Sequence, residues 1–300
     1  MQADALLACV STASCLVTQV STALIVGMLL FLVASGLSLI FGVLGIVNFA
    51  HGAFYMVGAY MAFTAYKLTG SFVLAIIAGT AGTAVFGVLF ERLVIARVYG
   101  RDLLLQLLAC YATTLILDDL VKLVFGAEYQ MMGMPAAFAL PPVQVAGGFL
   151  PPYYLFMVGL AMLTGLLLWL GINRTLMGKV VRALAANPRM VGVLGRNTTL
   201  IYAGVFGLGS GLAGLAGALA APIRTLTPGI GLSFLIDSFI VTVIGGMGSI
   251  AGAFVAALLV GFVRAFGAIG FPLFVDGTMF AMMVLVLVVK PTGLLGREAA

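Results

Sequence analysis

The chain has 300 residues, of which 63% are apolar and only 8% are charged, and its formal net charge is +5. Soluble domains average about 45–50% apolar and about 25% charged residues, so this composition excludes a soluble globular protein. The basic residues cluster between apolar runs, as membrane topology alone requires, so the positive charge predicts no nucleic-acid partner. A transmembrane helix needs about 20 apolar residues, and the chain lacks the alternation of a membrane β-barrel, so we expect an all-α polytopic transmembrane helical bundle.

The predicted membrane segments are apolar runs separated by Gly, Pro or charged residues. They cover residues 19–42, 46–66, 71–91, 103–125, 151–172, 199–221, 231–246, 249–268 and 273–289. They make eight or nine crossings, because Ile244–Gly252 is either a turn between two short spans or a break within a re-entrant hairpin. Nothing resembles a soluble second domain, so we expect a single transmembrane domain over residues 1–300.

The N-terminal part carries two of the three cysteines, Cys9 and Cys15, and the third is Cys110. They are odd in number, show no CxxC spacing and lie in apolar surroundings. Such cysteines are more often small buried hydrophobes than disulfide partners or metal ligands. We therefore assign no chemistry to them.

Residues 35–60 hold the only histidine, His51, close to Asn48. Nearby glycines loosen the helix, and a bilayer tolerates these polar groups only where they meet protein or water. Two interpretations stay open: the two side chains hydrogen-bond to a neighbouring helix and hold a bend, or they line the translocation pathway and its gate. One histidine without nearby acids or thiols predicts no metal site.

The loops differ in charge. Loop 126–150 has no basic residue and carries three prolines, so we expect an ordered external (periplasmic) loop. The stretches 92–102 and 173–198 and the C-terminal tail together hold ten of the fourteen basic residues. Positive charge marks cytoplasmic loops, so we expect the N-terminus outside and the C-terminus in the cytoplasm. The other basic residues, at or near the outer side, are Lys67, Lys122, Arg224 and Arg264.

Residues 173–198 are the most hydrophilic long segment between the apolar runs. We interpret them as a cytoplasmic coupling loop, the natural contact through which a soluble partner could move the bundle. Asn187 and Pro188 predict the start of a short helix, because proline suits a first helical turn.

A glycine stripe follows this loop at Gly204, Gly207, Gly211 and Gly214. Small residues three or four positions apart make a smooth helix face, so we expect a helix–helix or subunit seam. The chain has no Walker A motif, because Gly178-Lys179 is followed by Val180 where Ser or Thr is needed. We therefore expect no catalytic residue in this chain.

Asp237 lies within the seventh apolar run. Placing a carboxylate inside a membrane costs free energy, so such residues are candidates for a functional role. Asp237 is thus a candidate for the translocation pathway, balanced by Arg224 or Arg264, and the alternative is a purely structural ion pair.

Three strings carry a resemblance to a known family. GLSLIFGVLGIVNFAHGAFYMVGAY, which ends at Tyr60, is similar to the signature of the LivH-type membrane subunits of ABC importers for branched-chain amino acids. The similarity continues through RALAANPRMVGVLGRNTTLIYAGVFGLGSGLAGLAGAL (182–219) and VIGGMGSIAGAFVAALLVG (243–261). The resemblance covers most of the chain.

This resemblance implies a permease of the bacterial inner membrane. Its partners would be a second homologous permease, two ATP-binding cassette subunits and a periplasmic solute-binding protein, with ATP and Mg bound by the cassette subunits and no cofactor on this chain. Ala185-Ala186 and Gly192 resemble the EAA coupling loop, although Leu184 replaces its acidic residue and the glycine comes two positions late. The implied coupling residues are Arg182, Ala185, Ala186, Asn187, Pro188, Arg189, Gly192 and Arg196.

Two alternatives accompany this interpretation. Within the same family, the solute could be urea, a short amide or another small molecule. From a different class, the chain could be a homo-oligomeric channel or secondary carrier that uses Asp237, Asp118 or His51 for ion coupling.

Overall fold

The computed structural model describes residues 2–296, and each predicted apolar run contains a helix in this part of the chain, although the helix of the run 46–66 begins only at His51. The long helices are α2 (Ala13–Leu44), α3 (His51–Thr69), α4 (Phe72–Leu93), α5 (Leu103–Phe125), α6 (Pro152–Arg174), α9 (Thr198–Ala220), α10 (Ile230–Gly245), α11 (Ile250–Gly270) and α12 (Val275–Val289). The shorter elements are α1 (Gln2–Ser11), α7 (Leu176–Ala186), α8 (Pro188–Val193), η1 (Ile95–Arg97), η2 (Ala136–Phe138), η3 (Pro272–Phe274) and the hairpin of β1 (Val143–Val145) and β2 (Gly148–Leu150).

Seven helices in the described residues are long and apolar enough to cross a membrane. Helix α3 is not in this group, and helix α10 is too short for it, with 16 residues. A tight turn at Gly246–Ser249 connects α10 to α11. The expected all-α polytopic bundle is therefore confirmed. The expected number of membrane segments, eight or nine, is approximate.

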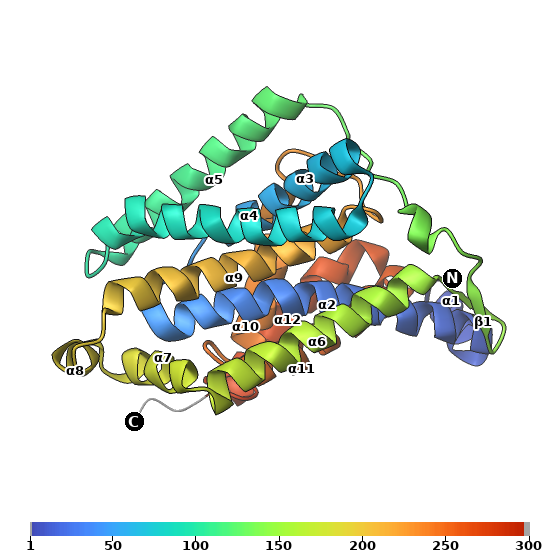
Figure 1. Cartoon of the computed structure of the whole chain (residues 1–300). Helices are drawn as coiled ribbons and strands as arrows, with labels where there is room; N and C mark the ends of the chain where they lie inside the picture. Colours follow the sequence, from blue (N-terminus) through green and yellow to red (C-terminus); the bar gives the residue numbers. More distant parts are fainter. Residues whose placement is uncertain (1, 297–300) are drawn as a thin grey trace.

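Helices α2 and α9 form the centre of the bundle (Figure 1). Helix α4 packs against α9, α6 packs against α2, and α11 packs on another side of α2. Every residue of α2 from Met28 to Ile40 is buried, and so is every residue of α9 from Gly209 to Ala220. Apolar positions all round a helix predict burial on all sides, and these two helices follow that rule.

Glycines of α9 allow its close approach to α4. A Cβ added at Gly214 would lie 2.5 Å from the carbonyl oxygen of Gly79, and one at Gly207 would lie 2.6 Å from the side chain of Val88. Gly211 faces Ala84 in the same seam.

Gly204 takes no part in this seam within the described residues. No described atom lies within 4 Å of a Cβ added there, and the residue is exposed. The seam between α4 and α9 therefore begins at Gly207, and a role for Gly204 in a subunit seam stays a prediction.

The N-terminal cysteines also differ from expectation. A disulfide joins Cys9 of α1 to Cys15 of α2, with the two Cα atoms 5.2 Å apart. The helix breaks at Thr12, whose backbone is extended with φ −111° and ψ 122°. The prediction that these two cysteines are unpaired was wrong, because apolar pattern alone gives no sign of this break. Cys110 is free and buried, as expected.

The loop between α5 and α6 is ordered and is tied to the bundle at several points. The backbones of Gln130 and Leu226 exchange hydrogen bonds of 3.0 and 2.9 Å. The Phe138 ring packs 4.9 Å from the Phe156 ring, measured between centroids. The β1–β2 hairpin reaches the N-terminal end of α2, where Gly148 lies against Val17.

Candidate functional site

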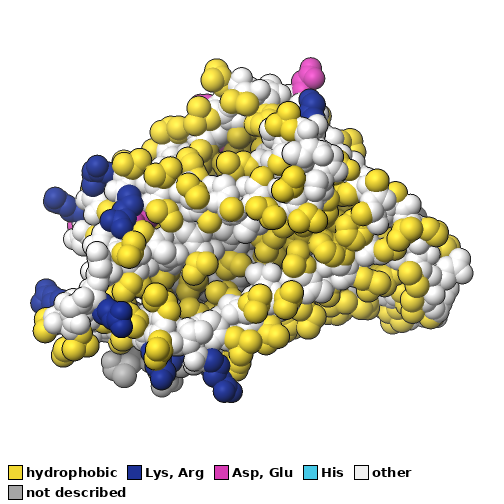
Figure 2. Space-filling view, in the orientation of Figure 1, with side chains coloured by type: hydrophobic (Ala, Val, Ile, Leu, Met, Phe, Trp, Pro, Cys, Tyr) yellow, Lys and Arg dark blue, Asp and Glu magenta, His cyan; other side chains and the backbone are white. Residues whose placement is uncertain are grey.

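The basic stretches expected in the cytoplasm lie together at one end of the molecule. The rings of Tyr99 and Tyr202 are 5.5 Å apart, which places the turn between α4 and α5 beside the start of α9. The tail reaches the same region, because the Leu294 N–H donates to the Ile244 carbonyl at 2.8 Å. On the face seen in Figure 2, most Lys and Arg side chains gather at the end that carries α7 and α8. Arg297 lies outside the described residues.

The coupling loop begins with α7, an amphipathic helix. The Thr175 hydroxyl caps it by accepting a hydrogen bond of 3.0 Å from the Gly178 N–H. Val181 and Leu184 are buried beneath it, and Val181 packs with Leu39 of α2 and Val205 of α9. Leu184 is fully buried, which explains why an apolar residue stands where the EAA pattern has an acid: a carboxylate here would be desolvated. Arg182 reaches back to the end of α6 and donates to the Ile172 carbonyl.

The short helix predicted after Asn187 is confirmed as α8. The Asn187 side chain accepts a hydrogen bond of 3.1 Å from the Met190 N–H, and Pro188 occupies the first turn. This is the expected chemistry of a helix start. The Asn side chain accepts from a backbone N–H that has no partner in the first turn, and proline has no backbone N–H that would need one.

The exposed side of this loop carries most of the proposed coupling residues. A Cβ added at Gly192 would meet no described atom within 4 Å, so nothing within this part of the chain fills the space beside it. The remaining members of the set that are exposed are Ala185, Ala186, Asn187, Pro188, Arg189 and Arg196. Three apolar side chains that the sequence reasoning missed are also exposed here: Met190, Val193 and Leu194. Apolar exposure beyond the ends of the membrane helices is typical of an interaction surface.

Asn48 and His51 lie deep in the bundle. Helix α2 ends at Gly45, whose φ of 68° lies in the left-handed region, and α3 does not begin until His51. The His51 Nε2 lies 3.0 Å from the carbonyl oxygen of Val33, which is about 16 Å along α2 from its end. The Asn48 Oδ1 accepts from the Ala50 N–H at 3.0 Å, and both side chains are fully buried. His51 thus makes the bond to another helix that the first interpretation requires, whereas Asn48 bonds only within its own turn. Asn48 Nδ2 and His51 Nδ1 are buried without a hydrogen-bond partner among the described residues, so both interpretations stay open.

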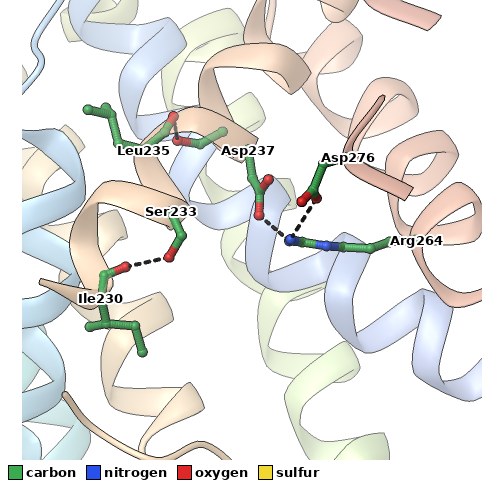
Figure 3. A network of polar contacts seen from close by, with 7 residues as sticks. Ile230, Ser233, Leu235, Asp237, Arg264 and Asp276 are labelled. Atoms are coloured by element: carbon green, nitrogen blue, oxygen red, sulfur yellow. Dashed lines mark hydrogen bonds and ion pairs between the residues drawn. The ribbon is translucent and has the colours of Figure 1, made fainter. Parts of the chain in front are cut away.

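Asp237 is paired with Arg264 (Figure 3). The guanidinium of Arg264 on α11 donates to the Asp237 carboxylate on α10, and its other nitrogen lies 3.7 Å from an oxygen of Asp276 on α12. Arg224, the other partner considered, instead lies over the Phe234 ring at 5.3 Å from its centroid. The structure therefore brings Asp237 into a network of three helices.

A second buried carboxylate, Glu91, was missed. It lies at the end of α4, is fully buried, and accepts a hydrogen bond of 2.7 Å from the Tyr99 hydroxyl. Burial, and then this bond to Glu91, raise the pKa of the Tyr99 phenol, so the phenol stays protonated and donates. The available signal was an acidic residue at the end of an apolar run, next to Arg92.

Comparisons with known proteins show the family of the chain. The family described as "Branched-chain amino acid transport system / permease component" matches residues 19–287. The chain belongs to this family.

The permease is 33% identical to the high-affinity branched-chain amino acid transport system permease protein BraD of Pseudomonas aeruginosa, over 93% of this chain and 95% of the relative. It is 30% identical to the corresponding protein LivH of Escherichia coli, over 89% and 91%. It is 27% identical to the probable branched-chain amino acid transport permease protein LivH of Methanocaldococcus jannaschii, over 92% and 91%. No solved structure matches the chain. The resemblance seen in the sequence motifs is confirmed.

Proposed function

We propose that this permease is the membrane-spanning subunit of an ATP-driven importer that moves branched-chain amino acids across the bacterial inner membrane. The observation that carries this proposal is the similarity to BraD and LivH over nearly the whole of both chains. Its partners are a second homologous permease, two ATP-binding cassette subunits and a periplasmic solute-binding protein, and ATP with Mg is bound by the cassette subunits.

The proposed contact with a cassette subunit is α8 and its flanks. Met190, Val193 and Leu194 supply an apolar centre, and Arg189 and Arg196 supply a basic rim. This is the usual anatomy of a protein interface, in which an apolar core is surrounded by polar groups. Closure of the cassette dimer would push on α8 and, through the buried side of α7, on α2 and α9. The bundle would then change between outward- and inward-facing states.

The proposed orientation has the N-terminus outside and the C-terminus in the cytoplasm. It is supported by the gathering of most Lys and Arg side chains on the face in Figure 2 at the end that carries α7 and α8, because basic loops stay in the cytoplasm. The loop 126–150 would then face the periplasm.

The channel or carrier alternative is less well supported. Ion coupling needs a carboxylate that can bind and release a cation, and Asp237 is already paired with Arg264. The buried His51 is likewise held by the Val33 carbonyl.

The test is purification of the permease with its genomic neighbours, followed by reconstitution in liposomes. We expect a Walker A protein to co-elute and ¹⁴C-leucine uptake to require both ATP and the solute-binding protein. Ion-driven leucine flux by the permease alone would overturn the proposal. Uptake of urea or a short amide in place of leucine would retain the mechanism and change the substrate.

A further inference from the structure

The N-terminal segment forms a covalently closed turn at the end of the molecule opposite α7 and α8 (Figure 1). Helix α1 folds back from α2 at Thr12 and packs against α11. Its Leu6 side chain fills the space beside Gly270, where an added Cβ would lie 2.6 Å from the Leu6 Cδ1. Helix α1 thus connects the end of α2 to the end of α11.

The disulfide lies beyond the depth of the membrane. Helix α2 has 32 residues. At about 1.5 Å per residue, Cys15 is about 44 Å along the axis from Leu44. The hydrocarbon core is about 30 Å thick, so Cys15 reaches the headgroup region or water. Ser14, beside it, lies against the turn of the β1–β2 hairpin at Gly147.

The bond matters because α1 has little else to hold it. A helix of ten residues is too short to be stable alone in water, and the extended backbone at Thr12 interrupts its continuity with α2. A crosslink across this break restricts the positions that α1 can take when it leaves α11.

We propose that Cys9 and Cys15 are oxidised on the outer side of the membrane, and that their disulfide is a brace that holds α1 across the outer ends of α2 and α11. This rests on the proposed orientation, because disulfides persist in the periplasm and not in the reducing cytosol. The oxidant is a periplasmic protein disulfide. The thiolate of Cys15, the more exposed of the two, attacks it to form a mixed disulfide and releases one oxidant thiol. Cys9 then attacks the mixed disulfide, and the oxidant leaves as a dithiol that carries the two electrons.

The test uses the full-length Cys110→Ser permease, in which Cys9 and Cys15 are the remaining thiols, in intact cells. A membrane-impermeant maleimide should not label it until a reductant is added, and labelling should then appear at Cys15. If the impermeant maleimide labels the permease without reductant, the cysteines lie on the outer side as free thiols. That result would support the proposed orientation and overturn the disulfide. After reduction, a permeant maleimide could label the cysteines while the impermeant reagent does not. That result would overturn both the proposed orientation and the brace.

Hydrogen exchange then tests the brace itself. In the complete importer, residues 6–11 should exchange several-fold faster in the Cys9→Ser/Cys15→Ser variant than in the Cys110→Ser control, while α9 exchanges equally in both. Equal exchange at residues 6–11 would show that the bond holds nothing in place.

Discussion

Arg264 on α11 donates to the carboxylate of Asp237 on α10, so a buried negative charge in this membrane bundle is neutralised by a neighbouring helix. Asp237 is almost fully buried, whereas Asp276, the second acid near Arg264, is largely exposed. The pair therefore joins α10 to α11, and Asp276 adds a weaker link to α12.

Removal of one partner should leave the other uncompensated. We expect Arg264→Leu to destabilise the permease by about 3 kcal/mol, since an unpaired buried charge is costly. The double variant Asp237→Leu/Arg264→Leu should recover much of this loss. The measurement is thermal unfolding in detergent, followed by size-exclusion chromatography. A double variant no more stable than Arg264→Leu would show that the pair is not the source of the effect.

The coupling proposal predicts a loss of function without a loss of folding. Gly192→Trp should insert and fold normally, because no described atom occupies the space beside Gly192. It should abolish leucine uptake and uncouple ATP hydrolysis, since the added ring would block contact with the cassette subunit. Gly159→Trp, which also enters open space but on α6, is the matched control. Normal uptake by the Gly192 variant would contradict the coupling role.

Charge reversal tests the same surface in a different way. Arg189 is exposed on α8, so Arg189→Glu should leave the thermal stability of the isolated permease within about 0.5 kcal/mol of wild type. It should nevertheless reduce co-purification of the cassette subunits. The amounts of both proteins are compared on a gel after affinity capture of the permease. Full recovery of the cassette subunits would place their contact elsewhere.

The glycine seam provides a comparison within one helix. Gly214→Leu should destabilise the bundle by about 1–3 kcal/mol or prevent folding, because the new side chain meets the Gly79 carbonyl. Gly204→Leu should be tolerated, since it enters open space. Expression and melting temperature distinguish the two, and equal effects would refute the boundary of the seam at Gly207.

His51 can be assigned a structural or a pathway role by experiment. His51→Leu should cost about 1–3 kcal/mol of stability through loss of the bond to Val33, and His51→Gln, which keeps a donor, should cost less. The KM for leucine uptake should stay unchanged in the assembled importer. A changed KM at unchanged stability would instead favour a role in the pathway.

The membrane segments could be predicted because lipid imposes long apolar runs. The predicted run at 103–125 coincides with α5, and the start of α8 followed from Asn187 and Pro188. The pairing of Cys9 with Cys15 could not be predicted, since it depends on the break at Thr12. The exposure of Met190 and its neighbours likewise depends on which side of α8 the bundle leaves uncovered.

The deep start of α3 has a consequence for biogenesis. The backbone at 45–50 is not helical, and one of its carbonyls, that of Phe49, is within hydrogen-bonding reach of the Thr114 hydroxyl on α5 at 3.5 Å. Such backbone is stable at membrane depth only when protein surrounds it. Helix α3 therefore cannot settle in lipid as an independent unit on leaving the translocon. Its final placement must wait until α5, more than fifty residues later in the chain, has been synthesised and inserted.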